Sequence, residues 1–61
     1  MRLEELLAES GTAGDKSQAV VSYLWKKQLL HKAMEMRDGA WFVTNREMVL
    51  RALQALYGKA A

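Results

Sequence analysis

Few side chains in this 61-residue sequence could carry out covalent chemistry. His31 is the only histidine and cysteine is absent, so the chain has neither a Cys–His pair nor the ligands of a recognisable zinc site. Ser10 and Ser17 lack the strand–turn–helix context of a nucleophile elbow. Gly11 and Gly14 do not fit the pattern of a phosphate-binding loop. We therefore expect no catalytic residue, no metal and no cofactor, and a protein that is not an enzyme.

The side chains that could bind a partner without covalent chemistry gather on one side of a helix predicted over residues 15–28. An apolar face that includes Val20 and Leu24 is expected to pack inward. At roughly 100° per residue, Gln18, Ser22 and Lys26 form an i, i+4, i+8 stripe on the opposite side, which contains no acidic residue. The stripe is either a binding surface or an ordinary solvated helix face.

The distribution of charge favours a surface that binds polyanions. The formal net charge is only +2. Residues 1–15 hold one basic and four acidic side chains, a net charge of −3, whereas residues 16–61 hold eight basic and three acidic side chains, a net charge of +5. This asymmetry fits a polyanion-binding face that starts at Lys16, and solubilising charge is the alternative.

Asp38-Gly39 predicts a β-hairpin, because both central positions of a type I′ turn require a positive φ. With these two residues as the loop, the cross-strand pairs are Arg37 with Ala40, Met36 with Trp41, Glu35 with Phe42 and Met34 with Val43. One face, expected to join the core, then holds four apolar side chains: Met34, Met36, Trp41 and Val43. Phe42 falls on the other face, where we expect the C-terminal helix to cover it unless it is exposed for a partner.

Helix-stop and helix-start signals divide the N-terminal half of the chain. A helix over residues 3–9 has its leucines on one face and stops at Ser10-Gly11. The next helix, over residues 15–28, has two possible N-caps, Thr12 and Asp15. We expect Trp25, near one edge of its inner face, to pack in the core.

A capping box of Thr44 and Glu47 predicts a C-terminal helix over about residues 45–57, with Gly58 as its C-terminal cap. The hairpin is expected over about residues 31–44, with His31 as a strand residue and Trp41 under the hairpin in the core. The order helix, helix, β-hairpin, helix predicts one mostly helical α+β domain over residues 1–61.

This order and one local pattern resemble the winged helix-turn-helix family. The resemblance lies in the run from Val21 to Lys32, the Asp38-Gly39 turn and the strand that ends at Thr44, and it covers about residues 12–44. Many winged helices share a recognition helix with inward Val and Leu, a Leu-Leu exit, a basic strand and a glycine-turned wing. The family usually has glycine where Gln28 stands, and three helices before the wing instead of two, unless Thr12–Lys16 forms a short turn of its own.

The resemblance implies a sequence-specific, double-stranded-DNA-binding regulator with the helix 15–28 in the major groove and the hairpin as a wing on the phosphate backbone. The residues then expected to contact bases are Gln18, Ser22, Tyr23 and Lys26. Those expected to contact phosphates are Lys16, Lys27, Lys32 and Arg37. Such a protein is expected to be cytoplasmic, nucleoid-associated and homodimeric.

A protein–protein interaction module is the alternative, because winged helices also serve in that role. Its contact surface, or the surface of a homodimer, is expected on the apolar stripe of the C-terminal helix: Val49, Leu50, Leu53, Leu56 and Tyr57. No membrane is expected as a partner, since no apolar run approaches the roughly 18 residues needed to span a bilayer. The first residues also lack the pattern of a signal peptide.

Overall fold

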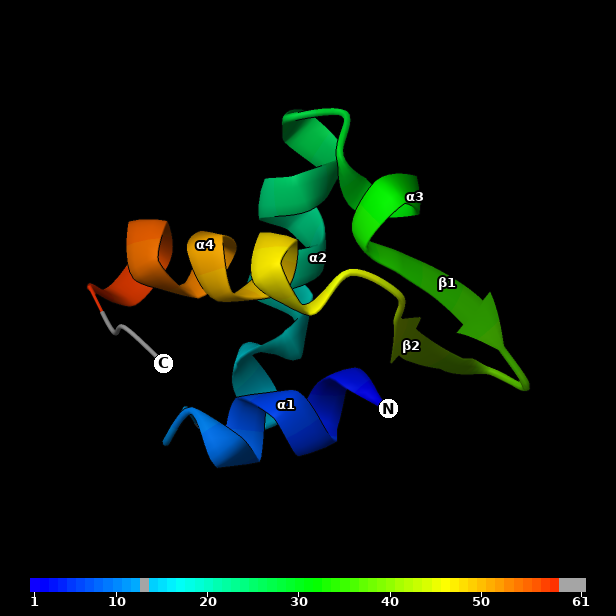
Figure 1. The fold of residues 1–61 in the computed structure, drawn as a ribbon, viewed down its shortest axis with the longest axis horizontal. Coiled ribbons are helices and arrows are strands. Elements are labelled where there is room, and N and C mark those ends of the chain that lie inside the picture. Colours follow the sequence, from blue (N-terminus) through cyan, green and yellow to red (C-terminus); the bar gives the residue numbers. More distant parts are fainter. Residues whose placement is uncertain (13, 59–61) are drawn as a thin grey trace.

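The computed structural model describes residues 1–12 and 14–58. Figure 1 shows a hairpin that projects away from the helices. The elements in chain order are α1 (Leu3–Glu9), the 3-10 turn η1 (Gly14–Lys16), α2 (Ser17–Lys26), α3 (Leu30–Ala33), β1 (Met34–Arg37), β2 (Ala40–Val43) and α4 (Arg46–Tyr57). The predicted α+β class and the order helix, helix, β-hairpin, helix are confirmed. Two short elements, η1 and α3, were not predicted as such.

The first helix has the predicted bounds and ends at the predicted glycine. Gly11 has a φ of 73°, which the lack of a Cβ permits. The Thr12 amide donates to the Leu7 carbonyl at 2.8 Å and the Gly11 amide to the Ala8 carbonyl at 3.1 Å, the hydrogen-bond pattern of a Schellman motif. All three leucines of α1 are buried.

The chain enters α2 through η1, and neither predicted N-cap is used. The N-cap position is Lys16, whose own backbone is helical and whose side chain makes no capping hydrogen bond. Asp15 is exposed within the preceding 3-10 turn, while Thr12 is buried and its hydroxyl has no partner among the described residues. The 3-10 turn is the short turn over Thr12–Lys16 that the sequence left open.

At its other end, α2 stops two residues before the predicted position. Gln28 has a φ of 60°, a left-handed conformation at the position where the winged-helix family usually has glycine. The Leu29 amide donates to the Leu24 carbonyl at 2.9 Å and the Gln28 amide to the Trp25 carbonyl at 3.0 Å. These two bonds complete a second Schellman motif, with Gln28 in the place of the usual glycine.

The hairpin has the predicted register in full: Met34 pairs with Val43, Glu35 with Phe42, Met36 with Trp41 and Arg37 with Ala40. Its loop residues Asp38 and Gly39 have φ values of 49° and 77°, as a type I′ turn requires. The prediction that the hairpin starts at residue 31 was wrong, because residues 30–33 form the single turn α3. The amides of Lys32 and Ala33 both donate to the Leu29 carbonyl, which closes that turn and places His31 on a helix.

Only the base of the hairpin's apolar face is buried. Met34 is buried, and Trp41 and Val43 are half-buried against the core. Met36, nearest the tip, is 53% exposed, so its predicted place in the core was wrong. Its cross-strand partner Trp41 lies on β2, the strand that α1 contacts, whereas Met36 lies on β1 in a hairpin that projects away from the helices (Figure 1).

Phe42, on the opposite face, is covered by two arginines. The guanidinium groups of Arg2 and Arg37 lie 5.9 and 5.6 Å from the centre of its ring. Arg2 also forms a β-bridge with Phe42, and the Val43 amide donates to the Met1 carbonyl at 2.7 Å. The N-terminal residues thus lie along β2 and occupy the place that the sequence assigned to the C-terminal helix.

The start of α4 differs from the predicted capping box. Asn45 is the N-cap, and its side chain accepts a hydrogen bond from the Met48 amide at 3.3 Å. Glu47 instead pairs with Arg51 one turn further on, at 2.6 Å. Gly58 ends the helix in the left-handed conformation, as predicted.

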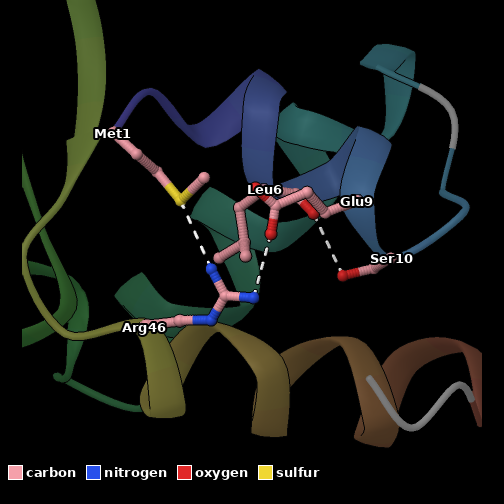
Figure 2. A network of polar contacts seen from close by, with 5 residues as sticks. All are labelled: Met1, Leu6, Glu9, Ser10 and Arg46. Carbon is pink, nitrogen blue, oxygen red and sulfur yellow. Dashed lines mark hydrogen bonds and ion pairs between the residues drawn. The ribbon is translucent and has the colours of Figure 1, made fainter.

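The core lies where α1, α2 and α4 meet. It consists of eleven buried apolar residues: Leu3, Leu6, Leu7, Val20, Leu24, Leu30, Ala33, Met34, Val49, Ala52 and Leu53. Figure 2 shows a polar contact at its margin, where Arg46 at the start of α4 reaches the two ends of α1. Its guanidinium donates to Glu9 Oε1 at 2.9 Å and approaches Met1 Sδ at 3.7 Å. The contact joins segments 37 residues apart in the chain.

Candidate nucleic-acid interface

The outer face of α2 holds three of the four predicted base-contacting residues. Gln18 and Lys26 are exposed and Ser22 is half-exposed, while Val20 and Leu24 on the inner face are buried. The exposed side chains therefore follow the i, i+4, i+8 stripe that the sequence predicts. One side chain that the sequence assigned to the core joins them.

Trp25 is that side chain, with 64% of its surface exposed. It stands seven residues after Gln18 and three after Ser22, spacings that place it on the same side of a helix. From Val20, the centre of the buried face, it lies about 140° around the helix axis. Its predicted core position was wrong, and its spacing from Gln18 is the signal in the sequence that indicates the outer face.

Beside Trp25, the turn from α2 into α3 forms a depression with a volume of about 460 Å³. Its lining residues come from the last turn of α2, from α3 and from the turn between them: Trp25, Lys26, Gln28, Leu30 and His31. The rings of Trp25 and His31 meet edge to face, with their centres 6.2 Å apart and their planes at 85°. The left-handed turn at Gln28 brings α3 back beside the end of α2 and so builds this corner.

Tyr23, the fourth predicted base contact, lies differently. It is half-buried and packs against the core. The Lys27 ammonium lies 5.7 Å from the centre of its ring, in cation–π range. Tyr23 and Lys27 thus contact each other instead of extending the stripe of Gln18, Ser22 and Lys26.

Three of the four arginines of the described chain form ion pairs, whereas its lysines form none. Arg37, Arg46 and Arg51 form ion pairs with Glu35, Glu9 and Glu47. The four lysines within the described residues are exposed and take part in no ion pair: Lys16, Lys26, Lys27 and Lys32. No acidic residue occurs between Lys16 and Met34. Apart from Arg2, whose guanidinium lies over the Phe42 ring, the basic side chains of the described residues without an ion pair therefore lie in the segment from η1 to α3.

The predicted wing contact, Arg37, is less available than the lysines. Its guanidinium pairs with Glu35 on the same strand and lies over the Phe42 ring. The pair is exposed, so water screens it and its contribution to stability is small, about 0–1 kcal/mol. The hairpin consequently presents a partly neutralised charge.

The predicted partner surface on α4 is mostly absent from the outside of the molecule. Val49 and Leu53 are fully buried in the core, where they meet α1 and α2, so their predicted role as surface contacts was wrong. Leu50 and Tyr57 are half-buried against the same core. Leu56 alone of the five is exposed, at 36%.

Comparison with protein-family models, with curated proteins and with solved structures finds no match to this chain. In residues 1–12 and 14–58, no three histidine, aspartate or glutamate side chains come together as metal ligands would. None of the helices in that part of the chain has the length and hydrophobicity needed to cross a membrane.

Proposed function

We propose that this protein binds double-stranded DNA as a sequence-specific regulator, with the outer face of α2 in the major groove. The observation that carries the proposal is the set of four exposed lysines without ion-pair partners on η1, α2 and α3, next to the polar stripe of α2. A groove lined by phosphates is the complementary surface, and an α-helix of this kind fits the major groove.

Each side chain of the stripe has a chemistry that suits a base edge. The Gln18 amide can donate and accept two hydrogen bonds with adenine N6 and N7, and Lys26 can donate to guanine O6 and N7. A bidentate pair of this sort discriminates by about 1–3 kcal/mol against a wrong base. Lys16, Lys27 and Lys32 are assigned to phosphates, which fix the register of the helix on the duplex without reading sequence. The hairpin contacts the phosphate backbone of the DNA through Arg37 alone.

The alternative, a protein-interaction module that uses α4, loses support from the burial of its central residues. Val49 and Leu53 would have to leave the core to reach a partner. Leu56, the exposed member of that stripe, gives little apolar area for a stable interface.

Titration of binding to a random-sequence duplex against salt concentration tests the proposal. On a random-sequence duplex Lys26 has no fixed guanine to contact, and it donates to a phosphate as Lys16, Lys27 and Lys32 do. With four phosphates neutralised, log K should fall against log salt with a slope of roughly −3 to −4. The Lys26→Glu variant should bind the duplex at least about tenfold more weakly and show a slope smaller by about 1.

Arg51→Glu is the matched control, because it makes the same change of net charge on α4, away from the proposed interface. It should alter affinity much less than Lys26→Glu does, and circular dichroism should show both variants folded. Equal losses in the two variants would mean that only net charge matters. No association of the wild type at low salt would refute DNA binding altogether.

A further inference from the structure

The corner between Trp25 and His31 has the chemistry of a nucleobase site. Trp25, whose indole is a flat π system, is 64% exposed, and the His31 ring meets it edge to face at 85°. Gln28, whose side-chain amide can both donate and accept hydrogen bonds, and Lys26 line the same depression. Its volume of about 460 Å³ lies within the range of small-molecule sites, roughly 300–1,000 Å³.

Charge favours a nucleotide over a peptide as the occupant. No acidic residue lies between Lys16 and Met34, and Lys26 adjoins the indole, so a phosphate next to a stacked base would be attracted. The aliphatic contribution to the depression is Leu30, which is itself only 5% exposed. A depression with five lining residues is far smaller than the roughly 800 Å² per partner of a stable protein–protein interface, whereas base stacking needs one aromatic face.

We propose that Trp25 stacks on an unpaired base, so that the protein prefers DNA with a gap or bulge over an intact duplex. A base within a continuous duplex has neighbours on both faces, and only an unpaired or flipped base can offer one to an indole. The inference rests on the proposed DNA binding, with the stripe of Gln18, Ser22 and Lys26 on the paired region. Trp25, at the C-terminal end of the same helix face, meets the break in the duplex.

Binding to three DNAs of matched sequence tests the inference: an intact 20-bp duplex, the same duplex with a two-nucleotide gap in one strand, and the single strand. The wild type should bind the gapped duplex about five- to tenfold more tightly than the intact one, toward the lower end of the effect of one stacked base. Trp25→Ala should abolish this preference while retaining binding to the intact duplex. Trp25→Phe, which keeps an aromatic face, should retain most of it.

Leu56→Ala is the control, since it truncates another exposed apolar side chain, on α4, and it should leave the preference unchanged. A preference that survives Trp25→Ala would overturn the stacking site while leaving duplex binding in place. Equal affinity of the wild type for the intact and the gapped duplex would likewise overturn the stacking site and leave duplex binding in place. No binding to any DNA would refute the proposed function and this inference together.

Fluorescence of the Trp41→Phe variant, whose single indole is Trp25, gives a second measurement. Gapped DNA should quench its emission more than intact duplex at equal occupancy. Deoxyadenosine monophosphate at the same concentration should not, because it lacks the duplex that the lysines hold. Quenching by the free nucleotide with no difference between the two duplexes would overturn the proposal. Quenching by an acidic peptide but not by gapped DNA would overturn it in favour of a protein partner.

Discussion

Gln28 holds a left-handed backbone conformation that residues with a Cβ rarely adopt, at a cost of roughly 1–2 kcal/mol. Two hydrogen bonds of the Schellman motif maintain it, from the amides of Gln28 and Leu29. The amide side chain that glycine would lack lines the depression beside Trp25. The residue thus combines a local strain with a place in the candidate site.

Gln28→Gly should raise the free energy of unfolding by about 0.5–1 kcal/mol, because glycine adopts a positive φ without steric cost and loses only part of that gain to chain entropy. Urea denaturation should show a higher midpoint with an unchanged slope. Gly58→Ala, at a left-handed helix end with open space around it, should shift the midpoint in the opposite direction. A lower midpoint for Gln28→Gly would mean that the left-handed turn is not formed in solution.

At the scale of elements, the hairpin and α4 are joined by a compact set of backbone contacts. The Ala33 carbonyl, at the end of α3, accepts from the amides of Thr44 and Asn45 at 2.8 and 3.0 Å. These two hydrogen bonds close the base of the hairpin and determine where α4 can begin. Asn45 is therefore held at the N-cap, one residue after the position that the sequence pattern indicates.

Asn45→Ala should lower the free energy of unfolding by about 1 kcal/mol, since its side chain satisfies the Met48 amide. Thr44→Ala should change it by less than about 0.5 kcal/mol, because Thr44 is exposed and lies outside the cap. Thermal denaturation followed by circular dichroism measures both. A larger loss for Thr44→Ala than for Asn45→Ala would instead support Thr44 as the N-cap, in a capping box with Glu47.

At the scale of the whole molecule, stability depends on one small core. A chain of 61 residues is near the size at which a single core is marginal, and no disulfide supplements it. The core joins three helices from opposite ends of the sequence, and the contact of Arg46 with Glu9 crosses the same junction (Figure 2). That ion pair is about half exposed on both sides, so the apolar contacts beneath it supply most of the stability.

Leu53→Ala should cost about 2–5 kcal/mol, because Leu53 is fully buried and the cavity cannot close freely between α1, α2 and α4. For a domain of this size that loss is comparable to the whole free energy of unfolding. We expect the variant to be largely unfolded by circular dichroism at 25 °C. Leu56→Ala on the same helix should cost less than about 1 kcal/mol, and equal losses in both variants would contradict the burial pattern.

The sequence alone determined the features that depend on local geometry. Asp38-Gly39 determined the turn, and with it every pair of the hairpin, because a two-residue loop and a side-chain period of two allow one register. The leucine spacing and Gly11 determined the bounds of α1 in the same way. The polar stripe on α2 also followed from periodicity, since Gln18, Ser22 and Lys26 recur every four residues, opposite Val20 and Leu24.

Only the tertiary structure decided what covers each surface. Trp25 stood near one edge of an apolar helix face and Phe42 on the outer face of the hairpin. Their exposure depended on packing: the described segments leave 64% of Trp25 exposed, whereas Arg2 and Arg37 cover Phe42. Val49 and Leu53 were recognised as apolar, but their burial depended on the approach of α1 and α2. Such contacts join residues far apart in the chain, and local patterns do not contain them.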